Sequence, residues 1–218
     1  DCSGFVQSVF ANFGIGLSRT AASQAGGGTS VSAHFEETLI RHCAATLAGH
    51  KCGSLFSYHP GAQENVADTI ASLNALLNQK GVRARLIGCC PRGGVLVYVY
   101  RPAALRETLS STEASAFLTD CGYPSGGTDA ALDTLTVRLQ DGRDAFPHEI
   151  GVFLGYPVQD VIAFIRHNGC GGCLCGCWKA YGNPSQAQRT FALYQKCRDV
   201  YLCCYRRGFD VTRLTVAA

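Results

Sequence analysis

RARLIGCCPRGGVLVYVYR, residues 83–101, is the most strand-like part of this chain. Its two ends, Arg83–Cys90 and Val95–Arg101, are rich in aliphatic, β-branched and aromatic residues, which favour strands. The four residues between them, PRGG at 91–94, are typical of a turn. We therefore expect a β-hairpin with a four-residue loop, and a sheet that is not purely parallel.

Helices are expected on both sides of this hairpin. Before it, apolar residues recur at helical spacing over 35–47 and 66–77, and a short strand-like run at 54–58 separates them. After it, the sequence predicts helices that begin at Pro102, at Ser110 with Glu113 in a capping box, at Thr128, at Pro157, and at Asn183 with Pro184. The last helix is the longest, and Gly208 is expected to end it.

Two shorter segments complete the pattern. Residues 148–156 form a short apolar run that we interpret as a strand, and residues 178–181 are β-like. The predicted fold class is therefore α/β (α+β). It consists of a small mixed sheet of three to five strands, including the hairpin, packed with helices and followed by a long C-terminal helix.

The composition excludes several classes of protein. Of 218 residues, 47% are hydrophobic, which fits one globular domain, or one domain plus a fragment. A formal net charge of +3 is too small to predict binding to nucleic acid or to an anionic membrane. No apolar run approaches the ~20 residues of a membrane-spanning helix.

The cysteine and methionine counts bear on location. There are thirteen cysteines, an odd number, and they include the adjacent pairs at 89–90 and 203–204. Such a set is poorly suited to a disulfide framework, so we expect reduced thiols and a cytoplasmic protein. The chain has no Met, and we therefore expect that residue 1 is not its natural start and that any signal would lie upstream.

The first 24 residues differ from the rest. DCSGFVQSVF at 1–10, followed by GIGLSRT at 14–20, resembles the nucleophile segment of NlpC/P60-type cysteine peptidases. The resemblance implies that Cys2 is a nucleophile at a helix N-terminus and that peptidoglycan is the substrate. That family supplies its base from a strand with one residue between His and Gly, whereas HEIGVFLG at 148–155 has two. We therefore expect a truncated segment in which Cys2 lacks an activating imidazole, with an active peptidase as the alternative.

The remainder of the chain, from about residue 33 to 216, resembles a different family. LIRHCAATLAGHK at 39–51, HEIGVFLGYPVQDV at 148–161, CGCWKAYG at 175–182 and YQKC at 194–197 are similar to a bacterial family known as domain of unknown function 3793. The family implies no established activity. The predicted organisation is a peptidase-like segment at 1–24, a Gly/Ser linker at 25–32 and an α/β domain at 33–216.

Polar and aromatic residues within these blocks are candidates for a binding site. His148 and Glu149 can bind a ligand or transfer a proton, although on a strand they would face opposite ways. Trp178 and Tyr181 can line a pocket for a flat ligand, with Lys179 for an anion. His42 and Lys51, both in the block at 39–51, are further candidates. The alternative is structural: His148 in a turn, Glu149 paired with an Arg, and Trp178 and Tyr181 in the core.

Four cysteines lie close together in a glycine-rich segment: Cys170, Cys173, Cys175 and Cys177. Thiolates at this spacing can bind zinc or an iron–sulfur cluster, although the spacing is not that of a zinc ribbon. The alternative is that these cysteines are small packing or turn residues.

The sequence therefore leaves three functions open, and each makes a structural prediction. A small-molecule or anion-binding domain requires a concave pocket that contains His148 or Lys179. A cysteine peptidase requires a histidine ring within about 4 Å of the Cys2 sulfur. A thiolate metal or redox module requires at least three of the four clustered sulfurs to converge.

Overall fold

A three-stranded sheet lies at the centre of the protein. The computed structural model describes residues 31–89, 93–125, 127–141 and 146–218. The strands β1 (Gly53–Tyr58), β2 (Arg83–Cys89) and β3 (Val95–Tyr100) are arranged in the order β1-β3-β2. β2 and β3 form the predicted hairpin, with a bulge between Leu86 and Gly88.

The sheet is antiparallel at every pairing in the described residues. β3 is antiparallel to both β1 and β2, so the two outer strands run in the same direction. They are joined by α3 (Val66–Leu77) and the short 3-10 helix η1 (Asn78–Lys80). The α+β class with a hairpin is therefore confirmed. The expected mixture of pairings is not seen, because β3 lies between the two parallel-running strands.

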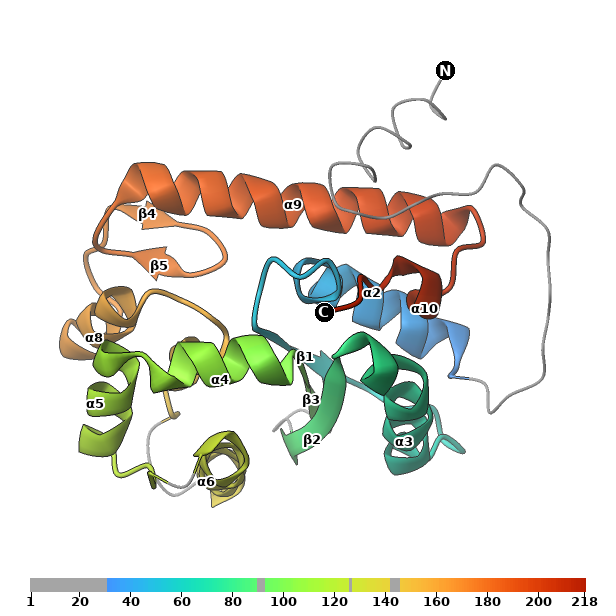
Figure 1. Cartoon of the computed structure of the whole chain (residues 1–218), viewed down its shortest axis with the longest axis horizontal. Coiled ribbons are helices and arrows are strands. Elements are labelled where there is room, and N and C mark those ends of the chain that lie inside the picture. Colours follow the sequence, from blue (N-terminus) through green and yellow to red (C-terminus); the bar gives the residue numbers. More distant parts are fainter. Residues whose placement is uncertain (1–30, 90–92, 126, 142–145) are drawn as a thin grey trace.

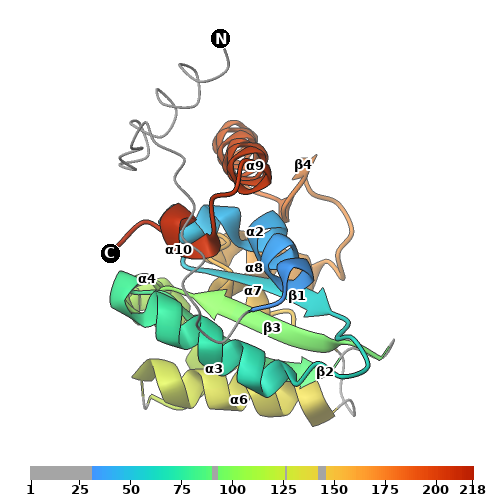
Figure 2. The same cartoon turned by 90° about the vertical axis from the view of Figure 1, so that its right-hand side faces the viewer.

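Alternating side chains of β3 separate two hydrophobic cores. Val97 and Val99 belong to the first core, and Tyr98 and Tyr100 belong to the second, as expected when successive side chains point to opposite faces. In Figure 2, α2 and α9 lie on one side of the sheet and α6 lies on the other.

The first core is covered by α2 (Ala33–Leu47), α3, α9 (Pro184–Arg206) and α10 (Val211–Leu214). The second core is covered by α4 (Pro102–Ser110), α5 (Thr112–Asp120), α6 (Gly127–Asp141), α7 (Ile150–Phe153) and α8 (Val158–Arg166).

Helix ends follow the capping residues in the sequence. Asn183 caps α9 by accepting a hydrogen bond from the Gln186 backbone, and Gly208, at φ +86°, follows its end. The cap of α5 is Ser111, which accepts from the Ala114 backbone, rather than the neighbouring Ser110 that we predicted. The long C-terminal helix is confirmed, and no described helix is both long and apolar enough to cross a membrane.

The carboxyl end of α2 is held by a buried cation. The Arg101 guanidinium donates to the carbonyl oxygens of Thr46 at 2.6 Å, of Leu47 at 2.7 Å and of Val216 at 2.7 Å. Each of these acceptors is a backbone group at the end of α2 or near the C-terminus, so Arg101 satisfies carbonyls that the helix leaves unpaired.

The expectation of a strand over residues 148–156 is wrong. His148 and Glu149 form a turn, and α7 follows as a single helical turn. The backbone of Val152 donates to the Glu149 carbonyl at 3.0 Å, which is turn bonding within the chain and not strand pairing. A short apolar run fits either structure by periodicity, and here its hydrogen bonds are local.

The β-like segment at 178–181 contributes to a second, two-stranded sheet. β4 (Leu174–Cys175) pairs antiparallel with β5 (Lys179–Ala180). Figure 1 shows this hairpin between the first turns of α9 and α8. The hairpin therefore brings the Cys/Gly-rich segment beside α8.

Candidate functional site

A cavity of about 260 Å³ lies between the β4–β5 hairpin, α7, α8 and β1. Most of its wall is aliphatic or aromatic, and three polar side chains reach it: His148, Asp160 and Lys179. Its lining comprises Leu55, Phe146, His148, Ile150, Gly151, Leu154, Tyr156, Asp160, Val161, Phe164, Trp178 and Lys179. A largely apolar hollow with a few convergent polar groups is the usual form of a small-molecule site. We call it the aromatic pocket.

α7 is anchored to the sheet and to α6, and this fixes one wall of the aromatic pocket. Tyr98 of β3 donates a hydrogen bond to the Phe153 carbonyl at 2.6 Å. At the other end of α7, the buried Glu149 carboxylate accepts from Arg138 of α6 at 2.7 Å and from the Tyr123 hydroxyl at 3.1 Å. Glu149 is therefore paired with an arginine away from the pocket, which is the arrangement expected if its role is structural.

The environment of Glu149 also affects Tyr123. Burial, together with the negative charge and hydrogen bond of Glu149, raises the pKa of the Tyr123 hydroxyl well above its usual range. Arg138 lies over the same ring, with its guanidinium carbon 4.7 Å from the ring centre. This cluster is a partly buried ion pair, in which Arg138 also donates to the Cys121 carbonyl, and it positions α7.

His148 lies at the solvent side of the aromatic pocket. Its exposed ring makes edge-to-face contacts with two phenylalanine rings, with centroid distances of 5.5 Å to Phe146 and 5.0 Å to Phe164. Phe146 is itself 52% exposed. The imidazole is thus held between two aromatic rings with its nitrogens available to a ligand that enters from solvent.

Trp178 forms the opposite wall and is held on three sides. Its indole nitrogen donates to Asp160 Oδ2 at 2.8 Å. Its ring stacks on Tyr156 at 5.2 Å and meets Phe191 of α9 edge-on at 4.5 Å. Because the ring has two aromatic partners and its polar tip is hydrogen-bonded, Trp178 presents a fixed surface to the pocket.

Asp160 organises this part of the molecule, and the sequence analysis did not single it out. Besides Trp178, its buried carboxylate accepts from the backbones of Tyr181 at 2.8 Å and Gly182 at 2.9 Å. Trp178 lies between β4 and β5, and Tyr181 and Gly182 directly follow β5, whereas Asp160 belongs to the first turn of α8. The available signal was an acidic residue within the apolar pattern of α8, since such a residue needs hydrogen-bond partners when it is buried.

Lys179 supplies the positive charge of the aromatic pocket. Its ammonium donates to the Gly169 carbonyl at 2.5 Å, which holds the half-buried side chain along the hairpin. An ammonium carries three protons, so this bond leaves donors for a bound anion. Lys179, His148 and Trp178 thus line the same cavity, and their role in binding stays a prediction.

Tyr181 and His42 do not line the aromatic pocket. The Tyr181 ring stacks on His167 at 5.8 Å, and its hydroxyl donates to the Cys170 carbonyl at 2.9 Å. His42 lies on α2 and stacks almost parallel on Phe56 at 5.7 Å. It borders a separate hollow of about 160 Å³ that also contains Lys51.

The clustered cysteines show no metal-binding arrangement. Cys170, Cys173, Cys175 and Cys177 are all exposed. Within the described ranges, no group of three or more His, Cys, Asp or Glu side chains is placed to hold a metal ion. The zinc or iron–sulfur interpretation therefore stays a prediction without geometric support.

The proposed nucleophile, Cys2, lies outside the described residues, as do the rest of the segment 1–24 and most of the linker 25–32. The peptidase interpretation therefore also stays a prediction, and the boundary between linker and domain is not tested. The structure begins with Val31 and the α2 cap Ser32, which accepts a hydrogen bond from the Phe35 backbone at 3.2 Å.

The fold and the aromatic pocket define an α+β protein with one preformed apolar cavity beside a small hairpin. Over residues 39–215 the chain matches the model of the family described as "Protein of unknown function (DUF3793)", and it belongs to that family. The resemblance over the larger part of the sequence is thus confirmed. Searches of the curated proteins and of the solved structures returned no match.

Proposed function

We propose that this protein binds a small aromatic or otherwise flat ligand that carries an anionic group. The observation that carries the proposal is the convergence of His148, Trp178 and Lys179 on one apolar cavity, although they come from two segments about thirty residues apart. Convergence of distant polar groups on a concave apolar surface is the arrangement expected of a ligand site.

The pocket assigns a role to each wall. The flat body of the ligand packs against Phe164 and the part of Trp178 that lines the cavity, where it removes apolar surface from water. Its anionic group faces the Lys179 ammonium, and the exposed His148 imidazole adds a hydrogen bond at the entrance. Asp160 takes no direct part, because its oxygens already accept hydrogen bonds from the hairpin.

The size of the cavity limits the ligand. About 260 Å³ is below the ~300–1,000 Å³ of pockets for drug-sized ligands. A single ring with a short acidic side chain therefore suits the aromatic pocket better than a dinucleotide or a peptide.

Trp178 is the only tryptophan in the chain, so its fluorescence reports on this pocket alone. We would titrate the protein with benzoate and phenylacetate and, as uncharged partners, with benzamide and phenylacetamide. The proposal expects saturable changes in emission that are stronger for the acids. Lys179→Gln should remove the preference for the acids, whereas Lys196→Gln, an exposed lysine of α9 outside the pocket, should keep it.

A pocket-filling variant provides the second arm. Val161→Phe adds a ring to the wall of the cavity and should abolish the response to all four compounds. A response in Val161→Phe equal to that of the unchanged protein, or no saturable response from any of the four compounds, would contradict the proposal.

A further inference from the structure

We propose that the hollow between α2, β1 and α9 is a second binding site, for a phosphate-sized oxyanion. The residues that carry the inference are Arg41, His42, Lys51, Tyr194 and Arg198, all of which line the hollow. The lining includes the basic side chains of Arg41, Lys51 and Arg198 and no Asp or Glu. We call it the basic hollow, and it is independent of the function proposed for the aromatic pocket.

Lys51 is the central group, because its charge is desolvated without a matching carboxylate. Its ammonium lies over the rings of Tyr156 at 5.2 Å and Tyr194 at 5.6 Å from their centres. Burial lowers the pKa of the Lys51 side chain, and nearby thiols oppose that shift only in part. No carboxylate of the described residues forms an ion pair with it, so an anion entering the hollow would supply the missing counter-charge.

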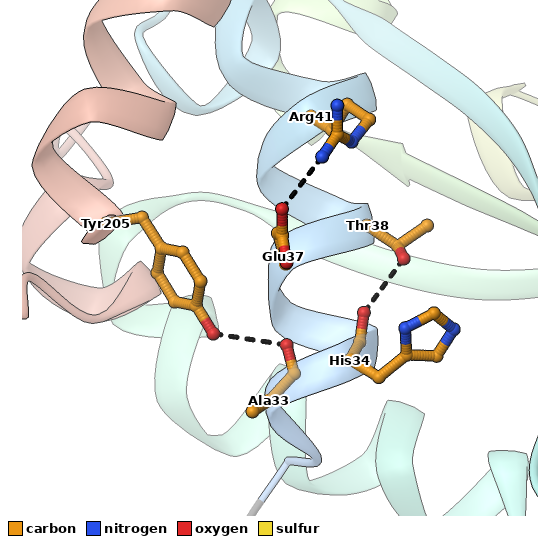
Figure 3. Close-up of polar contacts among 6 residues, drawn as sticks. All are labelled: Ala33, His34, Glu37, Thr38, Arg41 and Tyr205. Atoms are coloured by element: carbon orange, nitrogen blue, oxygen red, sulfur yellow. Dashed lines mark hydrogen bonds and ion pairs between the residues drawn. The ribbon is translucent and has the colours of Figure 1, made fainter.

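Two arginines extend the positive surface. The guanidinium groups of Arg41 and Arg198 both act on His42, whose pKa is lowered first by burial and then by these two charges. Arg41 is paired with Glu37 one turn earlier on α2, at 2.7 Å, as Figure 3 shows. Arg198 donates a hydrogen bond to the Gln195 side-chain oxygen, and its ion pair with Asp199 is long, at 3.9 Å.

Both of these arginine pairs lie at the surface, where ion pairs are weak and screened by salt. The guanidinium groups can therefore exchange their present partners for a multiply charged anion. A planar guanidinium also offers paired donors that match the oxygens of a phosphate.

The elements around the hollow are held together independently of any ligand. α2 and α9 pack along their lengths, and the Tyr205 hydroxyl of α9 donates to the Ala33 carbonyl at the start of α2, at 3.1 Å (Figure 3). The cations are thus carried by a preformed helix pair. The volume of about 160 Å³ admits one phosphate or sulfate with some water, and is too small for a nucleotide.

The test measures binding of inorganic phosphate by calorimetry at constant ionic strength, because screening alone would otherwise change the signal. We expect one saturable site. Lys51→Met, which keeps an unbranched side chain one atom shorter and removes the charge, should weaken binding at least ten-fold. Arg198→Gln should weaken it less, about three-fold, and the matched control Lys196→Gln should leave it unchanged.

A second measurement does not depend on a folded Lys51 variant. Acetic anhydride labels free amines, and mass spectrometry can compare Lys51 with Lys196 in the unaltered protein. Phosphate should slow the acetylation of Lys51 and leave that of Lys196 unchanged. Phenyl phosphate, tested in parallel, separates a site for the free ion from a site for a phosphoryl group on a larger molecule.

Binding of either compound with the Lys51 dependence supports the proposal. Protection that is equal at Lys51 and Lys196, equal losses in the Lys51→Met and Lys196→Gln variants, or no saturable binding of either compound would overturn it. A negative result for the basic hollow would not bear on the function proposed for the aromatic pocket, because Lys51 does not line that cavity.

Discussion

Residues of the aromatic pocket and of the basic hollow contact the same tyrosine, Tyr156, yet the two regions differ in how their charges are satisfied. Tyr156 stacks on Trp178 of the aromatic pocket and lies beneath the Lys51 ammonium of the basic hollow. In the first region the buried charge, Asp160, has three hydrogen-bond donors from the chain itself. In the second region the charge of Lys51 meets aromatic rings instead of a carboxylate.

This difference separates structural charges from charges that are open to a ligand. Arg101 illustrates the structural kind at the end of α2, since its guanidinium donates to three backbone carbonyls. Such groups stabilise the fold because both partners remain satisfied. A desolvated cation without an acceptor costs free energy in the folded protein, and binding of an anion can offset that cost.

The largest expected effect comes from removing the structural charge of the aromatic pocket. Asp160→Ala leaves the Trp178 indole and the backbones of Tyr181 and Gly182 without their acceptor. Each hydrogen bond to a charged group contributes ~1.5–3 kcal/mol, and water can replace part of this contribution in the variant. We therefore expect the free energy of unfolding to fall by about 3 kcal/mol. Urea unfolding measures the free energy, and Trp178 emission should shift to longer wavelength.

A milder variant is the matched comparison for this prediction. Asp160→Asn can still accept from the two backbone groups through its amide oxygen, but its NH2 group cannot accept from the indole. It should therefore lose less, about 1.5 kcal/mol, since one of the three hydrogen bonds to the charged carboxylate is broken. Equal destabilisation of both variants would show that the backbone bonds of Asp160 contribute little.

A smaller effect is expected from crowding the pocket wall. A Cβ atom added at Gly151 would lie 2.7 Å from Val161 Cγ2 and 3.3 Å from Tyr156 Cδ2. Gly151→Ala should therefore destabilise the protein by about 1–2 kcal/mol through overpacking, and should reduce binding of aryl acids. Gly61→Ala is the control, because nothing lies within 4 Å of its added Cβ. Chemical denaturation of both variants measures the difference, and a neutral Gly151→Ala would mean that the wall yields.

The sequence predicted the framework well because local signals specify it. The β2–β3 hairpin follows from two strand-forming segments around a Gly-rich turn, and α9 follows from Asn183, Pro184 and the helical spacing of its apolar residues. The run at 148–156 was interpreted wrongly because a short apolar segment has no period long enough to distinguish a strand from a helical turn.

The candidate site was predicted only in part, for a related reason. His148, Trp178 and Lys179 were singled out by residue type, and the structure places all three in one cavity. Asp160 was missed because its partners come from a hairpin about twenty residues later, and an Asp in the first turn of a helix is ordinarily explained by the helix dipole. The environment of Lys51 depends on Tyr194, about 140 residues further along, and local sequence carries no information on such a contact.

The smallest expected effect is a change in how stability depends on pH, and it tests the basic hollow directly. Burial lowers the pKa of Lys51 from its usual 10.5, so between the lowered value and 10.5 the unfolded chain binds more protons than the folded one. The contribution of Lys51 to stability must therefore rise as pH increases through that window and be lost as pH falls through the folded pKa. Other groups also titrate there, so the informative quantity is the difference between the protein and Lys51→Met.

We expect Lys51→Met to be more stable than the unchanged protein, with the largest difference in the free energy of unfolding at neutral pH. This advantage should shrink toward pH 10.5. Saturating phosphate should reduce the advantage at neutral pH, because a bound anion stabilises the charged form of Lys51 and raises its pKa. Denaturation curves at matched pH values, with and without phosphate, measure both effects. A pH-independent difference would mean that the Lys51 ammonium is as well solvated in the folded protein as in the unfolded chain, and the basic hollow would then lose its uncompensated charge.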